Sequence, residues 1–291
     1  MELKMNRDNE LTMIMEKMEE LENRIIQKQK KPYLKFEVHL CDHCNLNCKG
    51  CDHFSPLAEE HFLDLDSFKN DMFRLAELFG DRVLRIHLLG GEPLLTPNIV
   101  EYLHVARDAF PHNEVTIIDI LTNGLLLGKQ DELFWQTCKE LDIRIRITKY
   151  PINFDYDQIL SLAHSYGVFC DYYNDVSGGD KGLFKIALNK EGKGDPCKNF
   201  FNCRIGNKCI MLKNGRMYPC TLIPNIEHFN NYFNETFYED VCDSIDIYKA
   251  HTADEILEFL HNPVPFCKYC FREDVEYMDW EQSEKKINEW I

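Results

Sequence analysis

The chain has 291 residues and a mass of 34.4 kDa, enough for one large domain and an appendage, because single domains usually hold about 100 to 200 residues. It is 44% hydrophobic and 28% charged, which is typical of a globular protein and excludes wholesale disorder. The net charge of −16 repels phosphates, so we expect no nucleic-acid partner.

The N-terminus and the cysteine content indicate where the protein works. The first residues, MELKMNRDNE, lack the apolar stretch of a signal peptide, and no uncharged apolar run approaches the roughly 18 residues of a membrane span. We therefore expect a cytoplasmic protein with no membrane partner. The 13 cysteines cannot all pair, and in a reducing compartment they point to metal or redox chemistry rather than disulfides.

Residues 1–33 are predicted to form a separate N-terminal helix. Its apolar residues recur at steps of three and four on one seam, namely at Leu11, Ile14, Met18, Leu21 and Ile25. The seam is shorter than the three or four heptads of a convincing coiled coil. Packing against the chain's own domain and homodimerisation through this helix therefore both remain open.

From residue 34 onward, short β-like runs alternate with amphipathic helical segments. The predicted strands lie near 34–40, 83–89, 115–121, 143–148 and 167–172, and the predicted helices near 65–79, 98–109, 131–141 and 156–166. This alternation is typical of βα units that build a parallel sheet. After about residue 184 the alternation fades, and Asn214-Gly215 between two short β-like runs predicts a hairpin with a type I′ turn.

The strongest chemical signal is the segment CNLNCKGC directly after the first predicted strand, with Cys44, Cys48 and Cys51. Three thiolates at this spacing can hold three irons of a [4Fe-4S] cluster and leave the fourth iron open. A zinc knuckle is the alternative, although zinc sites usually take four ligands. The motif resembles that of the radical S-adenosylmethionine superfamily, in which it follows strand one of a partial (β/α)6 barrel. Cys41 lies outside this pattern and is interpreted as a strand-end residue.

Three further segments at predicted strand ends resemble cofactor-binding motifs of that family. LLGGEPLL resembles the GGE motif, whose carboxylate holds the amino group of the methionine moiety. TNG after the third strand and a threonine after the fourth resemble strand-end residues near the cofactor, although either could be an ordinary turn. The loops after the strands build the active site of a parallel barrel. The resemblance implies that the cofactor-binding residues are Gly90, Gly91, Glu92, Thr122, Asn123 and Thr148.

Two places leave the assignment of ligand contacts open. Gly50 precedes Cys51 where family members commonly have an aromatic residue near the adenine, so His53 or Phe54 could supply that contact. The segment 171–173 at the end of the fifth strand, Asp-Tyr-Tyr, could reach the substrate or form a solvated strand end.

The later cysteines resemble the start of the extension called SPASM, whose further cysteines are missing here. The resemblance is therefore to its shortened form, the twitch domain, which holds one auxiliary [4Fe-4S] cluster. The implied ligands are Cys203, Cys220, Cys267 and Cys270, with Cys197 or Cys209 as alternatives for the first. A structural zinc ribbon is the alternative interpretation.

The resemblance thus implies an α/β fold, with a partial (β/α)6 TIM-like barrel in residues 34–190 and a twitch-like region in residues 191–291. It implies an enzyme in which a reductant such as flavodoxin or ferredoxin supplies electrons. Cleavage of S-adenosyl-L-methionine then gives a 5′-deoxyadenosyl radical, which takes a hydrogen atom from the substrate.

The expected reaction is oxidation of a small molecule such as a sugar or cyclitol derivative. Peptide modification is the alternative, less favoured because only about 33 residues precede the barrel, where peptide-modifying relatives often carry a recognition domain. A noncatalytic iron-sulfur or zinc protein is the alternative from another class, and it would leave the GGE segment without a purpose beyond a turn.

Overall fold

The computed structural model describes residues 33–111, 115–173, 183–184, 187–271 and 277–291. The predicted N-terminal helix and the dimer through it therefore lie outside the described residues, apart from Tyr33. Within the described part, no helix combines the length and the apolar character needed to cross a membrane.

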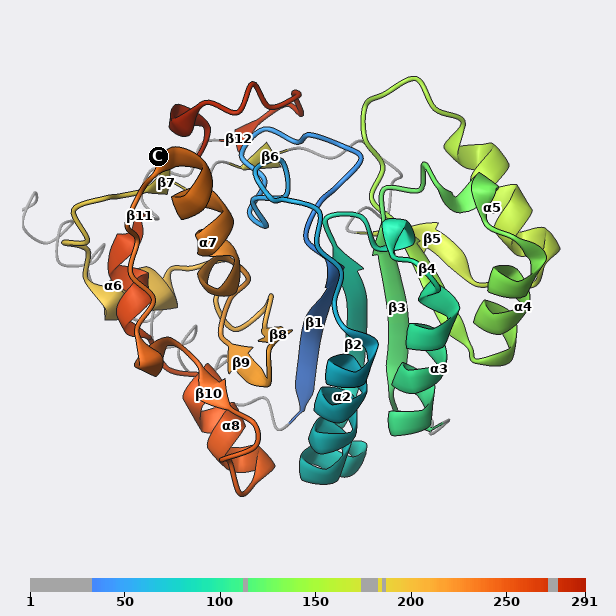
Figure 1. Cartoon of the computed structure of the whole chain (residues 1–291), viewed down its shortest axis with the longest axis horizontal. Helices are drawn as coiled ribbons and strands as arrows, with labels where there is room; N and C mark the ends of the chain where they lie inside the picture. Colours follow the sequence, from blue (N-terminus) through green and yellow to red (C-terminus); the bar gives the residue numbers. More distant parts are fainter. Residues whose placement is uncertain (1–32, 112–114, 174–182, 185–186, 272–276) are drawn as a thin grey trace, which may run out of the picture.

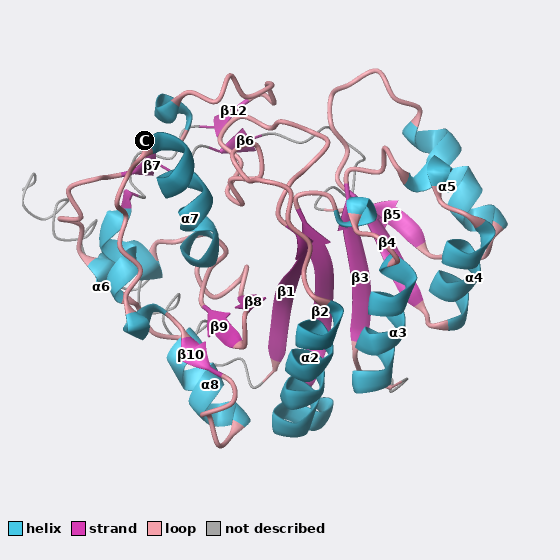
Figure 2. Cartoon of the chain, in the orientation of Figure 1, coloured by secondary structure: helices cyan, strands magenta, loops and turns pink. Residues whose placement is uncertain are grey.

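The main feature is an eight-stranded sheet with the order β10-β9-β8-β1-β2-β3-β4-β5 (Figure 2). Strands β1 to β5 are parallel and neighbour one another in chain order, as the βα alternation predicts. The strands of this sheet are β1 (Leu34–Cys41), β2 (Val83–Gly90), β3 (Ile117–Thr122), β4 (Ile143–Ile147), β5 (Cys170–Tyr172), β8 (Met211–Lys213), β9 (Arg216–Tyr218) and β10 (Ile245–Asp246). Two small sheets pair β7 (Ala187–Leu188) with β11 (Cys270–Phe271), and β6 (Leu183–Phe184) with β12 (Tyr277–Met278).

Helices follow the first four strands and lie over one face of the sheet (Figure 1). They are α2 (Leu65–Phe79), α3 (Ile99–Ala109), α4 (Glu132–Glu140) and α5 (Tyr156–Ser165), and the predicted ranges for all four are confirmed to within one residue at each end. The C-terminal part adds α6 (Pro196–Phe201), α7 (Leu222–Phe233) and α8 (Ala253–Leu260). Short 3-10 helices are η1 (Gly80–Arg82), η2 (Pro93–Leu95), η3 (Leu127–Lys129), η4 (Val241–Asp243), η5 (Pro265–Tyr269) and η6 (Ile287–Glu289).

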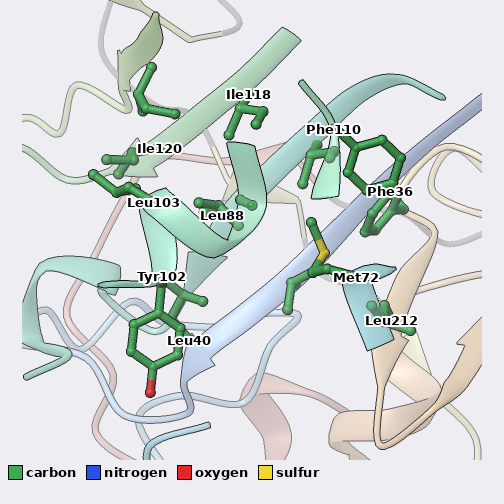
Figure 3. Packing of buried hydrophobic residues seen from close by; sticks show 14 of the residues in the cluster. Phe36, Leu40, Met72, Leu88, Tyr102, Leu103, Phe110, Ile118, Ile120 and Leu212 are labelled. Atoms are coloured by element: carbon green, nitrogen blue, oxygen red, sulfur yellow. The ribbon is translucent and has the colours of Figure 1, made fainter. Parts of the chain in front are cut away.

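The hydrophobic core lies between the sheet and these helices. Phe36, Leu88 and Ile118 from adjacent strands pack with Met72 of α2 and Leu103 of α3, and each is at most 1% exposed (Figure 3). Burying one such side chain contributes roughly 1.5 to 3 kcal/mol. Every second residue of the strands therefore faces the helices, which leaves the alternate residues on the opposite face of the sheet.

The predicted hairpin is confirmed and also extends the barrel sheet. Asn214 and Gly215 have φ angles of 51° and 70°, the left-handed values that a type I′ turn requires. Strand β8 runs parallel to β1, where Glu37 pairs with Met211. The sixth parallel strand thus comes from the predicted C-terminal region, so the two predicted regions share one sheet.

A second hydrophobic cluster lies in the C-terminal part. Phe229, Phe266 and Trp290 are buried there together with Phe54 and Leu57 of the loop that follows β1. The cysteine loop is therefore fixed between the barrel sheet and the C-terminal part of the chain.

Candidate cluster and cofactor site

The three cysteines of the first motif lie on the loop that follows β1 and share one small apolar cluster. Cys44, Cys48 and Cys51 pack there with Leu46 and Tyr150. Burial raises the pKa of the Cys44 thiol, and the nearby thiols of the other two cysteines raise it further. The loop therefore brings the three predicted ligands together.

Nitrogen donors point at two of these sulfur atoms. The Leu46 amide lies 3.3 Å from Cys44 Sγ, and the Trp280 indole Nε1 donates to Cys48 Sγ at 3.2 Å. Hydrogen bonds of this kind stabilise thiolates and tune the potential of iron-sulfur clusters. Three neighbouring thiols, two of them with an N–H group directed at the sulfur atom, fit the ligand set of a cluster with one open iron.

The GGE segment at the end of β2 lies directly against the cysteine loop. The amide of Gly91 donates to Cys41 O at 2.9 Å, and a Cβ on Gly91 would lie 1.9 Å from His43 O. A Cβ on Gly90 would meet Cys41 O at 2.1 Å. Both glycines are therefore required by the close approach of the two strand ends, whatever ligand binds nearby.

Glu92 is completely buried at the point where three strand ends meet. Its carboxylate accepts hydrogen bonds from Thr122 Oγ1 at 2.6 Å, from the Asn123 amide at 2.9 Å and from the Leu94 amide at 3.1 Å. Burial nevertheless raises the pKa of Glu92 to about 7, because desolvation outweighs these hydrogen bonds. A cationic group placed beside the carboxylate would favour its ionised form.

Asn123 connects this carboxylate to the cysteine loop. Its Nδ2 donates to Asn45 Oδ1 at 2.6 Å and lies 3.9 Å from Cys44 Sγ. One strand further along, the amide of Thr148 donates to Thr122 O at 2.9 Å. The structure thus brings the four predicted segments to one edge of the sheet, while the role of each side chain toward a ligand stays a prediction.

Residues 279–291, here called the C-terminal strap, cover the cysteine loop and were not foreseen from the sequence. The Lys49 amide donates to Glu281 O at 3.0 Å, and Cys48 forms a β-bridge with Gln282. Trp290 Nε1 donates to Cys51 O at 2.8 Å. Two of the three tryptophans of the chain lie in this strap, but nothing in their spacing indicates which loop they contact.

The two candidates for the missing aromatic contact lie in different surroundings. Phe54 is completely buried in the second hydrophobic cluster, 5.7 Å from the ring of Phe229, so its position is explained by core packing. His53 lies 3.1 Å from Gly90 O through Nδ1. The aromatic rings that accompany the cysteines are those of Tyr150 and Trp280, which lie 5.8 Å apart.

The second predicted ligand set also converges. Cys203, Cys220, Cys267 and Cys270 line one pocket, with Phe200, Ile223 and Phe266 among its apolar walls. Of the two alternatives for the first ligand, Cys197 is exposed and Cys209 does not line this pocket.

A backbone amide points at one sulfur atom of the same pocket. The Gly206 amide donates to Cys203 Sγ at 3.1 Å, and a Cβ on Gly206 would lie 3.4 Å from that sulfur. Four thiols in an apolar pocket fit an iron-sulfur cluster. In the described part of the chain no three His, Cys, Asp or Glu side chains are already arranged to hold a metal ion.

Comparisons with known proteins find relatives that match part of the chain. No family model matches the chain. It is 29% identical over 156 residues to a GTP 3′,8-cyclase of Listeria welshimeri, covering 52% of this chain and 43% of that protein. An uncharacterized protein of Methanocaldococcus jannaschii is 26% identical over 219 residues, covering 68% of this chain and 69% of that protein.

A solved structure shares the fold. The crystal structure of BtrN in complex with AdoMet and 2-DOIA superposes with a TM-score of 0.50 at 20% identity, covering 82% of this chain and 92% of BtrN. The α/β fold with a partial barrel is therefore confirmed. The matched part of the chain spans less than half the length of the cyclases.

Proposed function

We propose that this chain, a member of the radical S-adenosylmethionine superfamily, binds a [4Fe-4S] cluster at Cys44, Cys48 and Cys51 and cleaves S-adenosylmethionine reductively. The observation that carries the proposal is the junction of three strand ends, where Asn123 connects the cysteine loop to Glu92. Cys44, Cys48 and Cys51 would hold three irons of the cluster, which would supply the electron for cofactor cleavage and so the means to remove a hydrogen atom from the substrate.

The protein's own contribution at this edge is to hold and orient the cofactor. The buried carboxylate of Glu92, fixed by Thr122 and by two backbone amides, has the charge to bind the ammonium group of the methionine moiety. Thr148, on the next strand end, is the proposed partner of the ribose. The C-terminal strap covers part of the cysteine loop, where Trp280 donates to Cys48 Sγ and Trp290 donates to Cys51 O.

The proposed reaction is oxidation of a small molecule such as a sugar or cyclitol derivative. In this proposal the pocket of Cys203, Cys220, Cys267 and Cys270 holds an auxiliary [4Fe-4S] cluster. Four protein ligands leave no iron free to bind substrate, so such a cluster is suited to accept the electron left on a substrate radical. A flavodoxin or ferredoxin would supply the electron for cofactor cleavage.

The test is anaerobic reconstitution with iron and sulfide, followed by detection of 5′-deoxyadenosine after reduction. We expect the wild type to form it and the triple variant Cys44→Ala, Cys48→Ala, Cys51→Ala to form none while still holding iron at the other cysteine set. Cys242→Ala is the matched control, because Cys242 is exposed and lies outside both sets. Cleavage by the triple variant at the wild-type rate would refute the proposal.

A further inference from the structure

The face of the sheet opposite helices α2 to α5 carries charged side chains that the cofactor site does not use. In the register of the sheet Glu37 of β1 pairs with His87 of β2, and His87 pairs with Asp119 of β3. Residues in register on neighbouring strands point to the same face, whereas the adjacent residues Phe36 and Ile118 point into the apolar core. Glu37, His87 and Asp119 are here called the inner polar row.

This row is buried but only loosely paired. Asp119 is completely buried and Glu37 is 6% exposed. Asp119 Oδ2 lies 3.4 Å from Arg85 Nε and 3.6 Å from His87 Nε2, and Glu37 Oε1 lies 3.7 Å from His87 Nδ1. Each distance exceeds the roughly 2.7 to 3.2 Å of a formed N–H···O hydrogen bond. The side chains of the row therefore lie close to one another without forming hydrogen bonds among themselves.

Several polar atoms of this face have no hydrogen-bond partner among the described residues. They are both carboxylate oxygens of Asp119, Oε2 of Glu37, Nε2 of His87 and Nε of Arg146. Buried polar groups in native proteins are almost always hydrogen-bonded. Several buried polar atoms without hydrogen-bond partners on one face of a sheet therefore indicate a place where a bound molecule supplies the hydrogen bonds.

Tyr173, just after β5, closes one side of this group. Its ring meets that of His87 edge-on at a centroid distance of 5.7 Å, and the guanidinium of Arg146 lies 6.0 Å from the Tyr173 ring centroid. Burial, together with nearby Glu37, raises the pKa of Tyr173, so its hydroxyl stays protonated and able to donate.

The position of the row relative to the cofactor edge suits a substrate. Asp119 precedes Thr122 by three residues on the same strand, and a strand rises by about 3.3 Å per residue, so the row lies about 10 Å from the strand end where Thr122 meets Glu92. A small molecule resting on the row would reach from there toward the strand end.

The polar atoms without a hydrogen-bond partner also indicate which kind of small molecule the row could bind. Three are carboxylate oxygens, which only accept hydrogen bonds, and Arg146 Nε only donates. A hydroxyl group can do both, whereas a phosphate only accepts and would leave the three carboxylate oxygens without a donor. We propose that the inner polar row binds the substrate through neighbouring hydroxyl or amino groups of an unphosphorylated polyol or amino sugar, a proposal that rests on the proposed function.

The test measures binding of myo-inositol and glucosamine to the reconstituted full chain with S-adenosylmethionine present, by isothermal titration, with glucose 6-phosphate as the anionic counter-probe. We expect at least one of the two uncharged or cationic probes to bind and the phosphate not to bind. Asp119→Asn should weaken that binding at least tenfold, because it removes a charge-assisted acceptor. Glu37→Gln tests the same row from another strand should Asp119→Asn fold poorly.

Asp108→Asn is the matched control, because Asp108 is an exposed carboxylate on α3 and should leave binding unchanged. Absence of binding by both probes, or binding that survives both row variants, would overturn the assignment. Formation of 5′-deoxyadenosine without any probe is measured on the same samples. If the wild type forms no 5′-deoxyadenosine, the result counts against the proposed function. If Asp119→Asn still forms 5′-deoxyadenosine but no longer binds the probe, the result supports the row as a binding site separate from the cofactor site.

Discussion

The buried carboxylate of Glu92 makes the stability of the metal-free chain depend on pH in a way that one substitution should remove. Its pKa is raised to about 7 in the folded chain by burial, above the roughly 4.3 to 4.5 of an unfolded glutamate. A raised pKa means that the folded state binds the proton more tightly than the unfolded state. At low pH the protonated Glu92 therefore does not lower the free energy of unfolding. As the pH rises through the folded pKa, the buried side chain ionises and this free energy falls.

The size of the effect follows from that difference in pKa. Linkage gives a loss of about 2.5 kcal/mol in the free energy of unfolding between about pH 5 and pH 8. Glu92→Gln has no charge and should lose this slope. The glutamine also places an NH2 group where the carboxylate accepts hydrogen bonds from Thr122, Leu94 or Asn123. This loss should lower the free energy of unfolding by about 1 to 3 kcal/mol at every pH. The variant should thus be clearly less stable near pH 5 and close to the wild type near pH 8.

The assay is urea unfolding of the metal-free chain under anaerobic conditions, followed by circular dichroism at several pH values. Only the difference between wild type and variant is interpreted, since other groups titrate equally in both. Glu258→Gln, an exposed carboxylate on α8, is the control and should keep the wild-type slope. The reasoning would be refuted if Glu92→Gln also kept that slope. In the reconstituted protein the same variant should bind S-adenosylmethionine roughly tenfold to a hundredfold more weakly.

Three further predictions concern the two cysteine sets and the glycine between the strand ends. Trp280→Phe should lower the reduction potential of the reconstituted cluster by on the order of 40 mV, measured by a spectroscopic redox titration, because it removes a donor to Cys48 Sγ. Trp290→Phe, which loses a bond to a backbone oxygen only, should shift it less, and equal shifts would contradict this account. The double variant Cys267→Ala, Cys270→Ala should hold about half of the wild-type iron and should still cleave the cofactor, but it should form no oxidised product. Zinc at this site in anaerobically purified wild-type protein would rule out the electron-accepting role. Gly91→Ala should destabilise the fold by about 1 to 3 kcal/mol in the same urea assay, because its Cβ would meet His43 O at 1.9 Å, and wild-type stability would show that the strand ends can separate freely.

Local patterns were enough to predict the βα half of the fold and the positions of its motifs. The helix ranges and the Asn214-Gly215 turn could be predicted because periodicity and turn preferences depend on residues close in sequence. The meeting of Cys44, Glu92 and Asn123 was also predictable. In a parallel sheet built in chain order, the carboxyl ends of neighbouring strands must lie along one edge.

The sequence by itself therefore determined the parallel sheet, the cysteine loop and the GGE junction. Only the tertiary structure decided that β8 pairs with β1, that the strap of Trp280 and Trp290 covers the cysteine loop, and that Cys203 rather than Cys197 lines the pocket with the later thiols. Apart from Cys203 with Cys220, these contacts join residues more than 60 positions apart, and no local preference specifies such a partner. The alternating pattern of strands such as IRIRI fits a solvated face equally well, so the burial of Asp119 became visible only once the inner face of the sheet was formed.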